Sequence, residues 1–128
     1  MSISFVDLDR FKHINDTWGH EEGDRALIAI ADLMKAAFRE SDILARQGGD
    51  EFIILFANTS SHDAATAMET LSHNVARFNQ QAANPWQLAF SWGCVDYDPA
   101  SHPSLNALVA TADRLMYQAK QKQGRERR

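Results

Sequence analysis

The apolar residues of this chain recur with two different periods, and the two periods predict alternating strands and helices. Short apolar runs between polar residues predict strands at residues 3–9, 43–45, 53–56 and 88–95. Apolar residues at three- and four-residue spacing predict helices after residue 24, after Ser60 and from about Ser104. The predicted order is therefore strand, helix, strand, strand, helix, strand, helix.

This order of elements predicts the fold class. Helical crossovers on either side of a central hairpin are typical of an α+β fold, in which helices pack on a mixed, mainly antiparallel sheet. The layout is ferredoxin-like, or palm-type. A chain of 128 residues is long enough for one domain with a single sizeable core, so we expect residues 1–128 to form one unit.

Glycine residues mark two predicted connections. Gly48 and Gly49 separate the second and third predicted strands, and two adjacent glycines predict a hairpin turn because only glycine adopts a positive φ without steric cost. Residues 18–24 are polar and include two glycines, so they predict a loop before the first helix.

Acidic residues follow two of the predicted strands. Asp7 and Asp9 end the first strand, and Asp50 and Glu51 lie at the mouth of the hairpin. In the predicted topology these strand ends lie side by side, with Lys12 one short turn further on. Carboxylates with one nearby cation suit a magnesium-bound triphosphate, because Mg²⁺ takes one or two carboxylates and the phosphates of its substrate. The alternative is an ordinary acidic surface turn, which leaves the pairing of two acidic clusters unexplained.

The overall composition excludes several classes of function. A formal net charge of −4 argues against broad contact with a phosphate backbone, so we expect no nucleic-acid partner. Cys94 is the only cysteine, which favours a reducing compartment. The sequence has neither a long apolar run nor a signal-peptide pattern, so we expect a cytoplasmic domain with no membrane contact by this segment.

Four motifs occur in a fixed order from the first residues to the C-terminal tail. They are residues 7–16 (DLDRFKHIND), residues 19–24 (GHEEGD), residues 46–52 (RQGGDEF), and the last-helix positions Ala112, Asp113, Tyr117, Ala119 and Lys120. Together they resemble the signature blocks of the GGDEF diguanylate cyclase family. The resemblance implies an enzyme, a nucleotidyltransferase of bacterial signalling, that condenses two GTP molecules into cyclic di-GMP and releases pyrophosphate.

The resemblance also implies metal-binding and catalytic roles. Asp7 and Asp50 would be ligands of Mg²⁺ (or Mn²⁺), with the backbone carbonyl of Leu8 as a third ligand. Asp50 would help to deprotonate the attacking hydroxyl, and Glu51 would support the metal site. Lys12 would stabilise the negative charge of the departing pyrophosphate.

Further positions correspond to the family's substrate contacts. Asn15 and Asp24 would bind guanine, since a carboxylate accepts both the N1–H and the N2–H of that base, which adenine does not offer. His20 either lines the same pocket or is an ordinary loop histidine. The resemblance implies phosphate contacts by the backbone of Gly48 and Gly49 and by the side chains of Lys120 and Arg125.

A possible product site precedes the hairpin. Arg39 and Asp42 match the Arg-x-x-Asp inhibitory site of many family members, where cyclic di-GMP binds and restrains the enzyme. An arginine suits such a site because its planar fork pairs with phosphate and stacks on guanine. The alternative for this pair is an ion pair at a helix end.

The chain departs from the family pattern at its two ends. The helical segment that normally precedes the first strand is absent, which suggests a fragment of a longer signalling protein with a fused sensory or regulatory domain. Three residues separate Lys120 from Gly124, where the family usually has two, so Arg125 is rotated by about 100° on a helix. Catalysis in the family needs a homodimer of facing domains. The competing function is therefore a catalytically silent module that binds GTP or cyclic di-GMP.

Overall fold

The computed structural model describes residues 1–126, and for residues 123–126 it describes the backbone alone. Its elements, in chain order, are β1 (Ser2–Leu8), α1 (Phe11–Trp18), α2 (His20–Ala37), β2 (Ile43–Gly48), β3 (Glu51–Phe56), α3 (Ser61–Gln81), β4 (Phe90–Asp96) and α4 (Leu105–Glu126).

The four strands form one sheet in the order β2-β3-β1-β4. All three neighbouring pairs are antiparallel, so the described sheet contains none of the parallel pairing that a mixed sheet would have. The predicted α+β, ferredoxin-like arrangement is confirmed. Since β1 lies between β3 and β4, its carboxyl end is flanked by the start of β3 and the start of β4.

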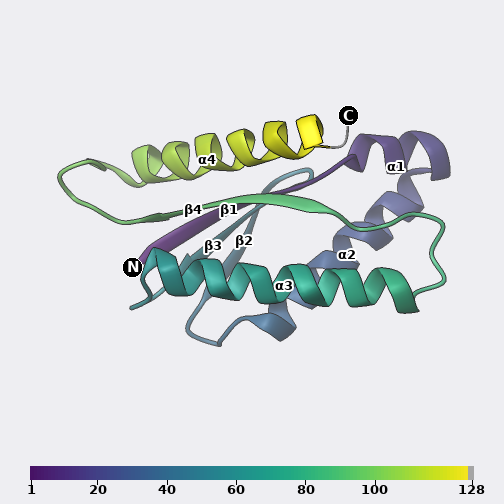
Figure 1. Ribbon diagram of the computed structural model, residues 1–128, viewed down its shortest axis with the longest axis horizontal. Coiled ribbons are helices and arrows are strands. Elements are labelled where there is room, and N and C mark those ends of the chain that lie inside the picture. Colours follow the sequence, from purple (N-terminus) through teal and green to yellow (C-terminus); the bar gives the residue numbers. More distant parts are fainter. Residues whose placement is uncertain (127–128) are drawn as a thin grey trace.

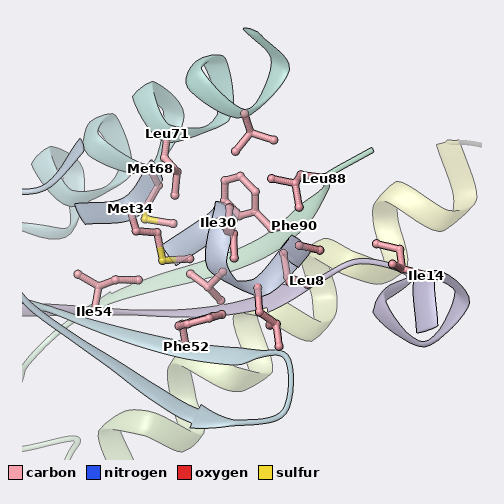
Figure 2. Close-up of a cluster of buried hydrophobic side chains, with 14 of the residues drawn as sticks. Leu8, Ile14, Ile30, Met34, Phe52, Ile54, Met68, Leu71, Leu88 and Phe90 are labelled. Carbon is pink, nitrogen blue, oxygen red and sulfur yellow. The ribbon is translucent and has the colours of Figure 1, made fainter. Parts of the chain in front are cut away.

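Helices cover the sheet on its two faces (Figure 1). α2 and α3 pack on one face through a large core that includes Ile30, Met34, Phe52 and Met68 (Figure 2). α4 packs on the opposite face through a smaller cluster around Phe5 and Leu108. Because α4 runs back along β1 and β4, its C-terminal half reaches the carboxyl end of β1.

Gly93 sets how closely α4 approaches the sheet. A Cβ atom at this position would overlap the backbone of Ala112 and Met116 on α4. Because glycine has no side chain, the backbone of α4 can lie directly on β4. This contact sets the distance between α4 and the sheet.

The loop predicted at residues 18–24 is wrong. Residues 11–18 form α1, and α2 begins at His20, so Gly19 alone separates two helices. Gly19 has φ 98° and ψ 164°, a conformation that is strained for other residues, and its N–H is bonded to the carbonyl of Asn15. One glycine therefore ends a helix where the polar composition indicated a longer loop.

The predicted position of the hairpin turn is wrong by one residue. Gly48 pairs with Glu51, so the turn consists of Gly49 and Asp50, and neither Gly48 nor Gly49 has a positive φ. The cause is an irregularity in the ladder between Arg46 and Gly48, where one extra residue on β2 shifts the pairing. The guanidinium of Arg46 donates to the carbonyl of Gly49 at 2.7 and 3.1 Å and holds the turn.

Candidate functional site

The ends of β1 and the β2–β3 hairpin bring the two acidic clusters together. Asp7 pairs across the ladder with Glu51, and the N–H of Leu8 donates to the carbonyl of Asp50 at 3.1 Å. The side-chain carboxyls of Asp7 and Asp50 are within hydrogen-bonding reach of each other. The carboxyl group of Asp7 thus meets those of Asp50 and Glu51, more than forty residues further along the chain, at one strand end.

This crowding raises the pKa values of the hairpin carboxyls. Burial, the hydrogen bond to Asp7 and the negative charge of Asp7 together raise the pKa of Asp50 from 3.8 to about 6. Burial also raises the pKa of Glu51, and the charges of Asp7 and Asp113 add to that effect. Asp50 and Glu51 therefore keep their protons to a higher pH than ordinary surface carboxyls do.

Lys120, on α4, neutralises part of this negative charge. Its ammonium donates to Asp7 Oδ2 at 2.7 Å and lies 3.8 Å from Asp9 Oδ1. Burial lowers the pKa of Lys120, but the hydrogen bond to Asp7 and the charges of Asp7, Asp9 and Asp50 outweigh burial and leave that pKa raised. Asp9 is itself buried and accepts a hydrogen bond from Ser91 Oγ at 2.8 Å.

The donor set fits a small divalent cation. Asp7 Oδ1 and Asp9 Oδ2 are buried oxygens without a hydrogen-bond partner, which is costly unless a cation or water satisfies them. Among the side chains that the structure describes, those of residues 1–122, no group of three or more acidic, histidine or cysteine residues could hold a metal alone. Two carboxylates with remaining places for phosphate oxygens and water match the preference of Mg²⁺. The side chain of Leu8 is buried in the core, so only its backbone is available to a ligand.

Asn15 and Asp24 lie on adjacent helices, α1 and α2, joined at Gly19. The amide of Asn15 rests on Gly23, where any side chain would overlap Asn15 Oδ1. Gly23 therefore makes room for Asn15 directly beside the position of Asp24. His20 is the exposed first residue of α2, so it is not a loop histidine, and it has no hydrogen-bond partner in the described structure.

The residues predicted to contact phosphate differ in how accessible they are to a ligand. A side chain at Gly49 would meet open space, which leaves its backbone accessible, whereas Gly48 lies against Glu51. Lys12 is exposed on α1, and it forms no ion pair with any of the side chains described, those of residues 1–122. The side chain of Arg125 lies outside the described part of the structure.

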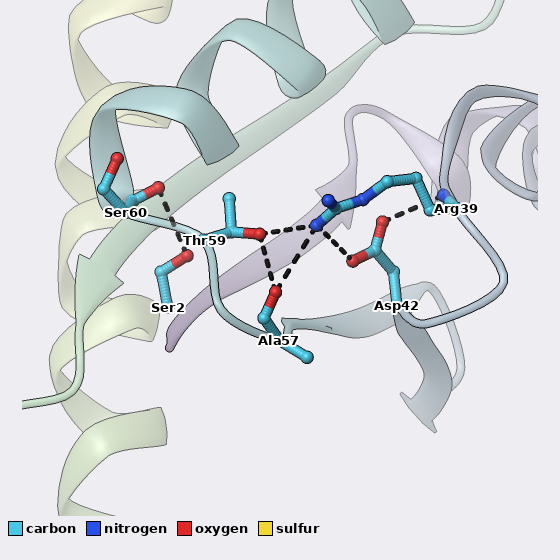
Figure 3. A network of polar contacts seen from close by, with 6 residues as sticks. All are labelled: Ser2, Arg39, Asp42, Ala57, Thr59 and Ser60. Atoms are coloured by element: carbon cyan, nitrogen blue, oxygen red, sulfur yellow. Dashed lines mark hydrogen bonds and ion pairs between the residues drawn. The ribbon is translucent and has the colours of Figure 1, made fainter.

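Arg39 and Asp42 form a contact network with the loop that precedes α3 (Figure 3). Arg39 Nη2 donates to Asp42 Oδ1 at 3.3 Å and to Thr59 Oγ1 at 2.5 Å, while the Arg39 N–H donates to Asp42 Oδ2 at 2.9 Å. The ion pair that formed the alternative interpretation is therefore present. The Arg39 side chain remains 61% exposed, so its free edge can still meet a ligand.

Sequence reasoning missed Arg46 and Thr59. Arg46 holds the turn that carries Asp50. Its position three residues before Gly49, across the hairpin, is the sequence feature from which this contact could have been predicted. Thr59 accepts from Arg39 and donates to the carbonyl of Ala57 at 2.8 Å, but it lies twenty residues from Arg39, and no sequence pattern connects the two.

One cleft, of about 520 Å³, lies between α1 and residues 85–89. Asp9 is its only contributor from the carboxylate clusters, and its other lining residues include His13, Trp18 and Trp86. The hairpin carboxylates Asp50 and Glu51 do not line this cleft.

Comparison with known proteins agrees with these motifs. A family model described as "Diguanylate cyclase, GGDEF domain" matches residues 1–127. The diguanylate cyclase DosC of Escherichia coli K12 is 35% identical over 127 residues, which cover 99% of this chain and 27% of DosC. The bifunctional diguanylate cyclase and cyclic di-GMP phosphodiesterase MucR of Pseudomonas aeruginosa is 38% identical over 124 residues, or 97% of this chain and 18% of MucR. The chain therefore spans about a quarter or less of these relatives.

Solved structures show the same fold. The GGDEF domain of DgcB from Caulobacter crescentus, in complex with c-di-GMP, has a TM-score of 0.84 and 26% identity, covering 94% of this chain and 72% of that one. Diguanylate cyclase SiaD from Pseudomonas aeruginosa, in complex with its activator SiaC, has a TM-score of 0.83 and 32% identity, covering 94% and 46%. Over residues 1–126, none of the helices combines the length and apolar character needed to cross a membrane.

Proposed function

Because this chain belongs to the GGDEF diguanylate cyclase domain family, we propose that it binds GTP and condenses two GTP molecules into cyclic di-GMP. The observation that supports this most directly is the meeting of Asp7 and Asp50 beside a buried carboxylate oxygen that has no partner. Such an arrangement suits a phosphate-bound cation and is unfavourable without one.

The proposed reaction is a double phosphoryl transfer. Each 3′-hydroxyl forms a bond to the α-phosphorus of the other GTP, each α–β phosphoanhydride bond breaks, and two pyrophosphates leave. The domain holds one GTP, so two copies must face each other. Holding two reactants in line supplies on the order of 7–11 kcal/mol of barrier reduction, and a single copy forfeits it.

Asp50 is proposed as the group that receives the hydroxyl proton. With a pKa of about 6 it is mostly ionised at neutral pH, and it is still more basic than an ordinary aspartate. A bound Mg²⁺ or Mn²⁺ would supply charge neutralisation at the phosphates and acidify the attacking hydroxyl. Glu51, whose pKa is also raised, would add negative charge that favours cation binding.

Lys120 is proposed to exchange partners when the nucleotide binds. It donates to Asp7 Oδ2 through a 2.7 Å hydrogen bond, while Asp7 Oδ1 has no partner and would be the oxygen open to a cation. A cation on Asp7 would repel the ammonium, which is 38% exposed and free to turn toward the phosphates. Lys12 and the backbone N–H groups of Gly48 and Gly49 would complete the phosphate contacts, and Arg125 would join them from the tail.

Guanine recognition is proposed for Asn15 and Asp24, with His20 at the entrance. The placement of the Asn15 amide over Gly23, beside Asp24, supports this role. An exposed carboxylate and an amide on neighbouring helices can meet the donor pair and the carbonyl of guanine together. Adenine would leave this carboxylate unpaired.

Arg39 and Asp42 are proposed to bind the product, cyclic di-GMP. The exposed edge of Arg39 and its fixation by Asp42 and Thr59 support this role, because a pre-oriented guanidinium loses little freedom on binding phosphate. Since the relatives DosC and MucR are several times longer than this chain, we also propose that a fused domain controls how often two copies meet.

The proposal is tested by incubating the purified chain with GTP and Mg²⁺ and separating the nucleotides. We expect cyclic di-GMP and pyrophosphate in a ratio of one to two, and slow turnover whose rate per protein rises with protein concentration. Fusion of a parallel coiled coil upstream, with the family's preceding helix restored, should raise the rate. Asp50→Asn should abolish turnover, whereas Glu69→Gln, an exposed carboxyl on α3, should not. GTP binding without any turnover in the fused protein would instead establish the silent regulatory module.

A further inference from the structure

An apolar groove lies on the outer surface of α2 and α3, away from the carboxylate site. Its volume is about 390 Å³, and it is lined by Arg25, Ile28, Ala29, Asp32, Leu33 and Phe78. These two helices cover the sheet face opposite α4 (Figure 1). Ile28 is 61% exposed and adjoins Ala29, Leu33 and Phe78 in the lining of the groove, and contiguous apolar patches of this kind are typical of contact surfaces.

The charges on this surface are arranged symmetrically about its apolar centre. Arg25 and Asp32 are seven residues apart on α2, so they share one helix face at a separation of about 10 Å. Ile28 and Ala29 lie midway between them. Arg25 is 69% exposed, and Asp32 has no ion-pair partner within the described chain. A positive end, an apolar middle and a negative end make the surface complementary to itself.

We propose that this groove is a contact between two copies of the chain, with their α2 helices antiparallel about a two-fold axis between Ile28 and Ala29. A two-fold axis at this place pairs residues that lie equally far on either side of it along α2, and each such pair occurs twice in the dimer. Arg25 then faces Asp32 of the second copy, twice over, and Ile28 packs over the small side chain of Ala29 in the second copy. Leu33 and Phe78 form the apolar walls around this centre.

Within one copy, Glu22 competes for the same arginine. Arg25 Nη1 donates to Glu22 Oε1 at 3.1 Å, while Glu22 Oε2 accepts from Trp86 Nε1 at 2.9 Å. Glu22 thus holds Arg25 from one side and leaves its remaining donors to the second copy. A contact made by one helix face is smaller than the roughly 1,200 Å² of a stable interface, so the association is weak and depends on concentration.

The test is sedimentation velocity of the 128-residue chain without nucleotide, from low to high micromolar concentration. The parent protein should shift from monomer toward dimer. Ile28→Glu should weaken this association about tenfold or more. The matched control is Ile43→Glu, the same substitution at a residue on β2 that is 58% exposed and outside the groove, and it should associate like the parent.

A charge swap tests the pairing itself. Asp32→Arg should weaken association because it places two arginines opposite each other, and adding Arg25→Asp to the same chain should restore it. Thermal melts of every variant would establish whether each is folded, which matters because Arg25→Asp also removes the ion pair with Glu22. The proposal is overturned if the parent stays monomeric, if Ile28→Glu associates like the parent, or if the double variant is no stronger than Asp32→Arg alone. Since no nucleotide is present, these outcomes are independent of the proposed enzyme function.

Discussion

Substitution of Asp50 by asparagine should stabilise the folded protein while removing the proposed catalytic group. The pKa of Asp50 is raised from 3.8 to about 6, so the folded state carries an unfavourable charge at neutral pH. Each pH unit between these two pKa values corresponds to about 1.4 kcal/mol, so ionised Asp50 destabilises the folded state by at most about 3 kcal/mol. Water on the exposed side of the carboxyl screens much of this destabilisation, so we expect the asparagine substitution to recover about 1 kcal/mol of folding free energy.

Asparagine offers a second gain, because its amide can donate a hydrogen bond to Asp7. Asp7 Oδ1 is buried and has no partner, and satisfying it is worth about 1 kcal/mol. We therefore expect Asp50→Asn to unfold at a temperature about 3–8 °C above the parent at pH 7.5 in metal-free buffer. Circular dichroism melts measure this directly.

The difference between the two proteins should depend on pH in a defined direction. The stabilisation that Asp50 provides is complete below its ordinary pKa of 3.8 and is lost as the pH rises through about 6. The advantage of Asp50→Asn should therefore be largest above pH 7 and should shrink on acidification toward pH 4. Glu69→Gln on α3 is the matched control, because Glu69 is exposed and has no ion-pair partner in the described chain.

Addition of Mg²⁺ with GTP should make the parent protein more stable than Asp50→Asn, the reverse of the order without ligand. A divalent cation with GTP should raise the unfolding temperature of the parent more than that of Asp50→Asn, because ligand binding stabilises only the state that binds it. The reasoning is refuted if Asp50→Asn is less stable than the parent at pH 7.5 without metal, or if its advantage is the same at pH 4 and pH 7.5.

Three further outcomes concern ligand binding. Asp24→Ala should weaken GTP binding by isothermal titration at least about tenfold while leaving ATP binding unchanged, and equal affinity of the parent for both nucleotides would contradict the assignment. Gly23→Ala should keep or raise the melting temperature, because alanine favours a helix by about 1 kcal/mol, and yet weaken GTP binding because it displaces Asn15; unchanged affinity would show that Asn15 does not contact guanine. Arg39→Ala should weaken cyclic di-GMP binding more than Thr59→Val does, since Thr59 only orients the guanidinium. If Arg39→Ala binds cyclic di-GMP as tightly as the parent does, Arg39 and Asp42 form only an ion pair and bind no product.

The acidic site illustrates how far sequence reasoning reaches. The strand order, together with the position of Asp7 at a strand end and Asp50 beside a hairpin, was sufficient to predict that these carboxylates meet. The exact turn was not predictable, because the irregularity between Arg46 and Gly48 shows no pattern in the residues themselves. A shift of one residue in a ladder changes which two residues form the turn, and the alternation of apolar residues is too short there to reveal it.

Helix boundaries show the same limit in another form. The apolar stripes of α2 and α3 were readable, since Leu27, Ile30, Met68 and Leu71 are all buried as their spacing requires. The polar segment before α2 indicated a loop, because local composition does not record that Gly19 alone can separate two helices. Packing of α1 against α2 decided that outcome, and such packing overrides local propensity.

The amino-acid sequence was sufficient to predict the order of the strands and of every helix except α1, the α+β fold class, the family motifs and the pairing of the two acidic clusters. These follow from periodicity and from motifs within short segments, which each residue's own chemistry encodes. Three features could be seen only in the folded structure: Lys120 contacts Asp7 across more than a hundred residues, Thr59 holds Arg39, and Ile28 remains exposed beside a groove. These contacts depend on how α4 and α3 pack on the sheet, and such packing is set by the shapes of side chains from several elements at once.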